Sequence, residues 1–199
     1  MNRIIEKSYF SEKVVRLVVE APEVAHARKP GHFVIVRCGE GGERIPLTIS
    51  DADEKAGTVT LVIQAVGKST EKICALEPGD TLTDLVGPLG RATAIGKREG
   101  TVLCCGGGVG VAPLLPIIKA FKAAGNRVVS VLAARNKDLI ILEDEVRAHS
   151  DEVIIMTDDG SSGRKGLVTA GVEEVIQREK VAEVVASGQE IIMKFVALL

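Results

Sequence analysis

The sequence predicts two domains, an antiparallel β-barrel over residues 1–97 and an α/β domain with a parallel sheet over residues 98–199. In the first half, short runs rich in β-branched residues are separated by turns that contain Gly and Pro. In the second half, strand-like apolar runs alternate with longer helix-like segments, which is typical of a parallel sheet with right-handed crossovers. Neither a repeat nor a low-complexity linker separates the two halves.

In the first half, the clearest strand-like runs cover residues 14–19, 32–36 and 58–63. The run from Arg44 to Ser50 also looks like a strand. Because Pro46 cannot donate to a ladder, we expect it on an edge or facing a ligand. The other expected elements are a hairpin turn, a short helix and a second turn, at residues 51–57, 69–75 and 87–90.

In the second half, Pro113 suits the first turn of a helix and Gly125 suits its C-terminal end. We expect strands at residues 101–105, 128–133, 152–157 and 183–186. We expect helices at residues 113–124, 139–148 and 169–178, and a last one that starts near Glu190. This alternation predicts a Rossmann-like domain.

The composition excludes several classes of protein. The 199 residues include 25 Lys and Arg against 27 Asp and Glu, and this near balance argues against a nucleic-acid partner. Aromatic residues make up only 3% of the chain, which leaves few platforms for stacking bases. No run approaches about 18 apolar residues and the N-terminus lacks a signal-peptide core, so we expect no membrane partner and a cytoplasmic location.

The four cysteines, Cys38, Cys74, Cys104 and Cys105, include no pair with the CxxC spacing that zinc sites use. Cys104 and Cys105 lie in an apolar run that we interpret as a buried strand. We therefore expect buried, reduced thiols and no metal ligands.

The strongest local motif is the glycine-rich turn from Gly106 to Gly110, between the first strand and the first helix of the second half. Its glycines let a ligand approach the backbone, and the helix start that follows favours a diphosphate. The standard G-x-G-x-x-G pattern fails, because position 111 is Val and position 113 is Pro. A tight turn without a ligand is the alternative.

Other polar segments also suit a nucleotide. Asp158 and Asp159 follow the third strand, at the carboxyl edge where open α/β sheets bind ligands, and Arg135 follows the second. The segment from Gly67 to Thr70 offers a Lys charge, hydroxyls and a helix start. It is no Walker A loop, because Val62 stands where that motif has its first Gly.

Together these segments resemble the ferredoxin-reductase-like flavoproteins, which join an FAD-binding barrel to an NAD(P)-binding α/β domain. The matching segments are collinear over essentially the whole chain and cover residues 44–49, 67–70, 87–90 and 106–113. Three segments, residues 43–49, 66–70 and 157–166, are similar to one subgroup in particular. That subgroup is the small (alpha) subunit of NADH-dependent ferredoxin:NADP+ reductase, also named a sulfide dehydrogenase subunit. The electron-transfer subunit of dihydroorotate dehydrogenase is close behind.

The resemblance also implies which residues bind the cofactors. The flavin ring is lined by Ile45, Pro46, Leu47, Thr48, Val62, Ile63 and Gln64, with Thr48 as the catalytic residue near N5. The FAD diphosphate is held by Gly67, Lys68, Ser69 and Thr70, and Arg44 can bind a phosphate nearby. In the wider family the Arg of the flavin motif stands where this chain has Ile45, and Arg44 is one residue earlier. The nicotinamide nucleotide is bound by Gly107, Gly108, Val109, Gly110, Val111, Arg135, Asp158 and Asp159.

The implied function is hydride transfer from NADH, with NADPH as the alternative, to FAD, and onward transfer of electrons to a partner. That partner is a larger catalytic flavoprotein subunit, in a heterodimer or a larger assembly, and ferredoxin is a further candidate. Both subgroups continue into a cysteine-rich segment that holds a [2Fe-2S] cluster. We expect that cluster only beyond Leu199, so the sequence suggests a truncated chain or a variant without it.

Three alternatives stay open at this point. The chain could be the electron-transfer subunit of a dihydroorotate dehydrogenase in pyrimidine biosynthesis. It could be a non-catalytic nucleotide-binding or electron-transfer module that needs a partner. It could also be an α/β protein whose glycine-rich turns bind some other anion.

Overall fold

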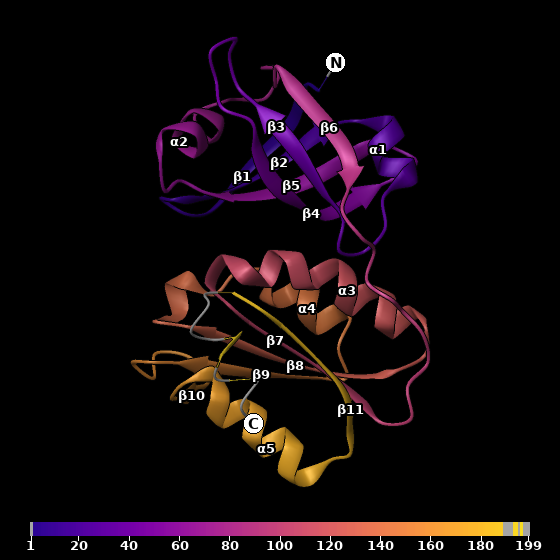
Figure 1. Cartoon of the computed structure of the whole chain (residues 1–199). Coiled ribbons are helices and arrows are strands. Elements are labelled where there is room, and N and C mark those ends of the chain that lie inside the picture. The colour runs from indigo at the N-terminus through magenta and orange to yellow at the C-terminus, as the bar shows by residue number, and fades with distance from the viewer. Residues whose placement is uncertain (1, 189–192, 195, 197–199) are drawn as a thin grey trace. The chain divides into compact units, whose positions relative to one another are not determined.

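The computed structural model describes residues 2–188, 193–194 and 196, and the chain divides into two compact units, residues 1–93 and 94–199 (Figure 1). The first unit contains a six-stranded antiparallel sheet and the second a five-stranded parallel sheet. This confirms the predicted fold class, a barrel-like antiparallel sheet followed by an α/β domain.

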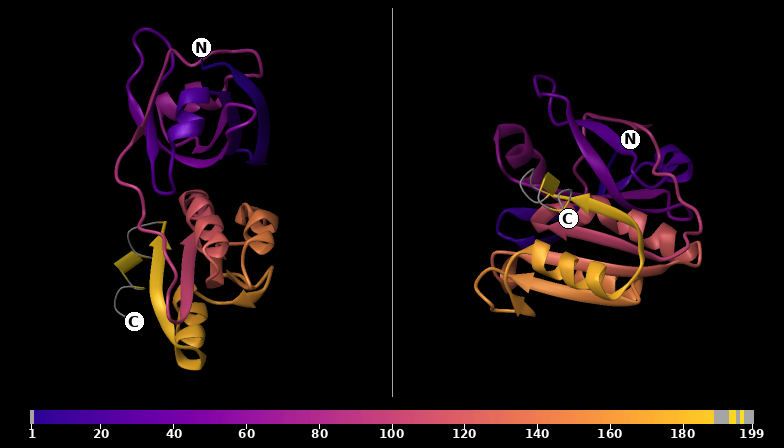
Figure 2. Two further views of the ribbon diagram at one scale, coloured as in Figure 1. Left: turned by 90° about the vertical axis from the view of Figure 1, so that its right-hand side faces the viewer. Right: turned by 60° about the horizontal axis from the view of Figure 1, so that its bottom comes forward.

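The strands of the first unit follow the spatial order β1-β2-β5-β4-β3-β6. In chain order its elements are β1 (Ile4–Ser11), β2 (Val14–Glu20), α1 (Pro22–Ala27), β3 (Phe33–Arg37), β4 (Ile45–Asp53), β5 (Thr58–Gln64), α2 (Lys68–Cys74) and β6 (Asp84–Leu89). The sheet curves on itself (Figure 2). Arg3, just before β1, pairs with Thr81, just before β6, and this backbone bridge joins the two outer strands.

Strand alternation builds the core of this unit. Inward-facing residues such as Leu17, Val36 and Leu61 are fully buried. Each contributes roughly 1.5–3 kcal/mol by leaving water. The outward-facing residues of the same strands are not needed for this core and are available to bind a ligand.

The sequence predicted the position of Pro46 but not the element around Pro88. Pro46 pairs with Ile35 of β3, while β4 pairs with β5 only from Ile49 onward, so Pro46 lies on a locally open strand edge as expected. The turn predicted at residues 87–90 is wrong, because Gly87 to Leu89 belong to β6. The register between β3 and β6 shifts at this point, which accommodates the missing donor of Pro88.

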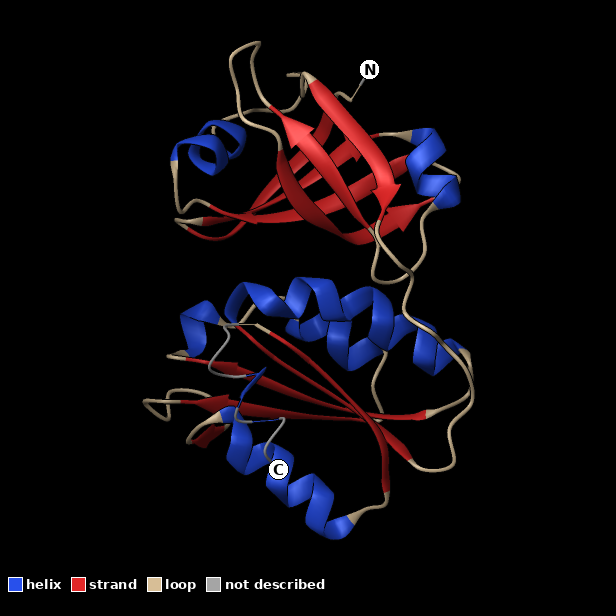
Figure 3. Cartoon of the chain, in the orientation of Figure 1, coloured by secondary structure: helices blue, strands red, loops and turns tan. Residues whose placement is uncertain are grey.

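The second unit has strand order β10-β9-β8-β7-β11. Its elements are β7 (Thr101–Gly107), α3 (Val111–Ala123), β8 (Arg127–Ala134), α4 (Glu143–Ala148), β9 (Glu152–Thr157), β10 (Arg164–Lys165), α5 (Val168–Arg178) and β11 (Val181–Ser187), with short 3-10 turns at Gly108–Gly110 and Lys137–Leu139. Helices α3 and α4 cover one face of the sheet and α5 covers the other (Figure 3). Within the described residues, no helix has the length and apolar character needed to cross a bilayer.

One predicted helix starts later than expected. We expected it from residue 139, but Leu142 has a left-handed backbone (φ 59°) and α4 begins only at Glu143. Ile141 and Leu142 are both buried, so the chain turns to place them in the core. Three acidic residues in the first turn then favour a helix start at this point. Glu190, where the last helix was expected to start, lies outside the described residues.

Two of the four cysteines are buried as predicted, and two are only partly so. Cys104 and Cys105 lie inside β7, and burial raises the pKa of Cys105 to about 12. Cys38 and Cys74 are half-buried, and burial also raises the pKa of the Cys74 thiol. All four cysteines are free in the structure.

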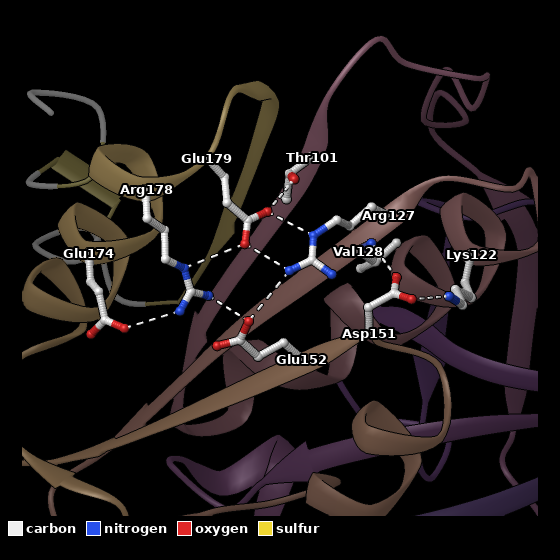
Figure 4. Close-up of polar contacts among 9 residues, drawn as sticks. All are labelled: Thr101, Lys122, Arg127, Val128, Asp151, Glu152, Glu174, Arg178 and Glu179. Atoms are coloured by element: carbon white, nitrogen blue, oxygen red, sulfur yellow. Dashed lines mark hydrogen bonds and ion pairs between the residues drawn. The ribbon is translucent and has the colours of Figure 1, made fainter.

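The amino ends of the parallel strands are joined by a charged network (Figure 4). Glu179, just before β11, accepts hydrogen bonds from Arg127 Nε at 2.8 Å, Arg127 Nη2 at 2.7 Å and Thr101 Oγ1 at 2.6 Å. Arg178 Nη2 donates to Glu152 at 2.5 Å. The network thus ties together β7, β8, β9 and the entry to β11. The guanidinium of Arg127 lowers the pKa of Glu179 to about 2, from an ordinary value of 4.5.

We predict that Glu179→Gln lowers the free energy of unfolding at pH 7 by about 1–2 kcal/mol, because Arg127 and Thr101 lose a charged acceptor. The native carboxylate stabilises the fold fully above about pH 4.5, and this contribution disappears as the pH falls toward 2. Urea unfolding at several pH values should therefore show a larger difference between the two proteins at pH 7 than at pH 3. Glu173→Gln, in the exposed part of α5, is the control. Equal effects of both substitutions would contradict the prediction.

Candidate functional site

The first candidate region is the outward face of β4. Ile45 and Leu47 pack against the barrel core. By strand alternation, Arg44, Pro46 and Thr48 lie on the opposite face, with Pro46 exposed and Thr48 half-buried. This strip is locally open on the side away from β3, because β4 pairs with β5 only from Ile49 onward.

The end of β5 contributes mainly backbone. Val62 and Ile63 are buried, whereas Gln64 is exposed. A ligand beside this strand would meet the backbone of residues 62–63 and the side chain of Gln64. The two apolar residues thus belong to the core rather than to a binding surface.

The loop before α2 is shaped by a hydroxyl group from the first turn of the same helix. Thr70 Oγ1 accepts hydrogen bonds from the N–H of Val66 at 3.0 Å and of Gly67 at 3.1 Å, and donates to Gly67 O at 2.9 Å. The Thr70 hydroxyl therefore shapes the loop. A Cβ built at Gly67 would meet no heavy atom within 4 Å, so the space above this glycine is free for a ligand.

A pocket of about 230 Å³ opens beside this helix start. It is lined by Cys38, Gly41, Gly42, Glu43, Lys68, Ser69, Lys72 and Ile73. Ser69 Oγ donates to Glu43 Oε2 at 2.8 Å, which fixes the loop before β4 against α2. Two lysines on one face of the helix make this pocket suitable for a phosphate group.

Arg44 does not project freely into solvent. Its Nε and Nη2 donate to Asp84 Oδ2 at 3.2 Å and 3.1 Å. Arg37 donates to the same carboxylate, from Nε to Oδ2 at 2.7 Å and from Nη2 to Oδ1 at 3.2 Å. The guanidinium groups of Arg37 and Arg44 hold the pKa of Asp84 below its usual range.

The second candidate region is the carboxyl edge of the parallel sheet. From β7 the chain continues to β8 on one side, while β11 pairs on the other, so the sheet order reverses between β7 and β11. Such reversal points form ligand crevices in open α/β sheets. The glycine-rich turn leaves β7 at this point, where Gly106 pairs with Ser187 of β11.

The glycines of this turn have different roles. A Cβ at Gly110 would lie 2.4 Å from Gly188 Cα, and one at Gly106 would lie 2.5 Å from Leu114 Cδ1. Gly110 needs glycine because a Cβ would meet backbone, whereas a Cβ at Gly106 would require the Leu114 side chain to shift. Gly108 has φ 55° and no heavy atom within 4 Å of a built Cβ, so the space there is open to a ligand.

The structure brings together the loops after β8 and β9. The N–H groups of Asp158 and Asp159 donate to the carbonyl oxygens of Ala134 and Arg135, at 3.1 Å and 3.3 Å. Asp159 Oδ1 accepts from both the N–H and the hydroxyl of Ser161, and these hydrogen bonds lower the pKa of Asp159. The predicted residues Arg135, Asp158 and Asp159 thus share one edge of the sheet.

Sequence reasoning missed four residues that shape these regions, namely Arg37, Glu43, Asp84 and Ser161. Arg37 directly follows a predicted strand, and Asp84 is the first residue of β6, part of which was predicted as a turn. A correct prediction of β6, paired with the strand before Arg37, would have placed the opposite charges of Arg37 and Asp84 next to each other. Nothing in the sequence indicated the hydrogen bond between Glu43 and Ser69.

No protein-family model matches the sequence. The chain is 43% identical over 198 residues to a Thermotoga maritima protein named dihydroorotate dehydrogenase B (NAD(+)), electron transfer subunit homolog. This match spans the whole chain and 70% of that relative.

Solved structures give a similar result. The structure of an NADH-dependent reduced ferredoxin-NADP oxidoreductase superimposes with a TM-score of 0.94 at 40% identity, over all of this chain and 71% of that one. A ferredoxin NADP+ reductase from Neisseria gonorrhoeae with bound FAD and NADP superimposes with a TM-score of 0.79 at 16% identity, over 99% of this chain and 88% of that one. The second likeness shows the shared fold.

We predict that alanine is tolerated differently at the two glycine-rich sites. Gly110→Ala should lower the free energy of unfolding by about 2 kcal/mol, because its Cβ meets the backbone of Gly188. Gly67→Ala should change it by less than about 1 kcal/mol, since the backbone there is extended and the space is open. Thermal and urea unfolding of the flavin-free proteins would measure both. A Gly67→Ala variant as unstable as Gly110→Ala would refute the distinction.

Proposed function

Because the chain belongs to the family of dihydroorotate dehydrogenase B electron-transfer subunits and their homologues, we propose that it is an oxidoreductase subunit that moves electrons from NADH through FAD to a partner subunit. The observation that carries this proposal is the match over the entire chain to an NADH-dependent ferredoxin-NADP oxidoreductase, at 40% identity and a TM-score of 0.94. The partner is a larger catalytic subunit.

The residues of the first unit fit a flavin dinucleotide. The open space above Gly67 and the lysines Lys68 and Lys72 suit a diphosphate at the start of α2. Residues 45–48 of β4 would line the ring through their outer face, where Pro46 and Thr48 lie, with Thr48 near its N5 atom. Residues 62–64 of β5 would contact it through the backbone of Val62 and Ile63 and the side chain of Gln64. When bound, FAD accepts a hydride and releases electrons one at a time.

The residues of the second unit would bind and orient the nicotinamide nucleotide. The turn from Gly107 to Val111 lies at the reversal of the sheet, where the space above Gly108 is open to the nucleotide. Arg135, Asp158 and Asp159 would contact the ribose and adenine end. The protein's contribution is to bind and orient each cofactor, and because the cofactors supply the redox chemistry, no acid–base pair is required.

We test this function with recombinant protein loaded with FAD and reduced without oxygen. NADH should bleach the flavin absorbance. Gly67→Ala should weaken FAD binding about tenfold or more, because its Cβ fills the space of the ligand. Protein that takes up no FAD would overturn the proposal. Bound flavin that NADH cannot reduce would leave a non-catalytic binding module.

We also propose that NADH is preferred over NADPH. Arg135 could attract a 2′-phosphate, but Asp158 and Asp159 place two carboxylates on the loop whose backbone is hydrogen-bonded to Arg135, and these disfavour a 2′-phosphate by charge repulsion. The expected ratio of kcat/KM for NADH over NADPH is about tenfold or more, and Asp158→Asn should reduce this ratio severalfold. Glu173→Gln, remote on α5, should leave it unchanged. Equal use of both nucleotides by the wild-type protein would refute the preference.

The two similar proteins suggest two different substrates for the partner subunit, and in the alternative dihydroorotate is the electron donor. The name of the reductase points to ferredoxin and NADP+, and the name of the Thermotoga relative points to dihydroorotate. We propose the first, with the second as the alternative. Co-purification of the native partner would decide, since a subunit that oxidises dihydroorotate would support only the alternative.

A further inference from the structure

Three charged side chains form one row across β4, β3 and β6. Arg37 and Asp84 are direct partners across β3 and β6. Ile45 is paired with Val36, so Arg44 comes level with Arg37 at the next position. Val36 points into the core, and the row therefore lies on the outer face of the barrel.

Arg44 must cross β3 to reach its partner. Asp84 is two strands away from β4, a distance of roughly 10 Å at the usual strand spacing. The Arg44 side chain is 65% exposed, yet its Nε and Nη2 both donate to Asp84. An exposed arginine without such a partner samples many rotamers and loses that freedom when it binds a ligand.

The cluster keeps a positive charge for a ligand. Two guanidinium groups share one carboxylate, which leaves a net charge of +1. Arg37 donates from both Nε and Nη2 to Asp84 and from Nη1 to Glu40 O, whereas Arg44 makes no contact to Asp84 through Nη1. The hydrogen bonds to Asp84 thus use the Nε and Nη2 groups of Arg44 and not its Nη1 group, which can donate to a ligand.

The row lies at one end of the strip that we propose for the flavin. Arg44 directly precedes β4, and the four residues from it to Thr48 span about 13 Å of extended chain. A ring at Thr48 that continues through an extended five-carbon chain would bring its phosphates toward Arg44. The residue before Arg44, Glu43, is hydrogen-bonded to Ser69 at the start of α2, the proposed diphosphate site.

We propose that Asp84, supported by Arg37, is a positioning residue that holds the Arg44 guanidinium ready for the FAD diphosphate. This inference rests on the proposed function, since it requires FAD in the first unit.

The test compares FAD with riboflavin, which lacks phosphate, on the flavin-free full chain. Asp84→Asn should weaken FAD binding about tenfold and leave riboflavin binding unchanged. Arg44→Ala should weaken FAD binding at least as much. In the Arg44→Ala background, Asp84→Asn should have no further effect, because it acts through Arg44. Flavin fluorescence titration gives the dissociation constants.

Glu77→Gln, which removes the ion pair with Lys7 in the same unit, is the matched control and should not change FAD affinity. Additive losses in the double variant, or equal losses for FAD and riboflavin, would overturn the inference. If Asp84→Asn does not fold, Asp84→Glu decides, because it keeps the charge but displaces the carboxylate. An unchanged ratio of FAD to riboflavin affinity in that variant would also overturn the inference. Wild-type protein that binds no FAD would overturn the proposed function itself, whereas normal FAD binding by Asp84→Asn would overturn only the role of Asp84.

Discussion

The two-residue period of β4 is the constraint on which the first unit depends. Ile45 and Leu47 contact the barrel core, and this fixes the opposite face for Arg44, Pro46 and Thr48. A shift of one residue would bury the arginine and expose the apolar pair. Core packing and the placement of the candidate flavin residues are therefore one and the same requirement on this strand.

In the second unit, charged residues that stabilise the sheet lie at the amino ends of the strands, and the candidate binding residues lie at the carboxyl ends. Glu179, Arg127 and Glu152 connect the amino ends of the sheet through charged hydrogen bonds. The carboxyl ends have glycines and short polar loops instead, where the backbone is accessible. Buried strands such as β7 join the two ends, so the charged network at the amino ends can stabilise a sheet whose carboxyl edge contributes little packing.

The sequence predicted the elements that have a strong local signal. The parallel strands and the helix that starts near Pro113 were recognised from apolar runs and from helix start and stop residues. The helix predicted from residue 139 is wrong over residues 139–142, because the burial of Ile141 and Leu142 overrides their local helical pattern. The turn predicted at residues 87–90 is wrong over residues 87–89. A Gly-Pro pair usually marks a turn, whereas here pairing with β3 places it in a strand. The site residues came from resemblance, and contacts such as Arg44 to Asp84 depend on register between distant strands, which no local pattern contains.

The backbone bridge between Arg3 and Thr81 has a consequence for assembly. The N–H of Ile4 donates to Asp80 O and the N–H of Leu82 donates to Asn2 O, so peptide groups beside the outer strands of the first unit are used internally. An incoming chain cannot add a strand at this seam by pairing with groups that are already satisfied. At this seam, a neighbouring subunit must recognise the barrel through side chains, whose identity can differ from one complex to another while the barrel stays the same.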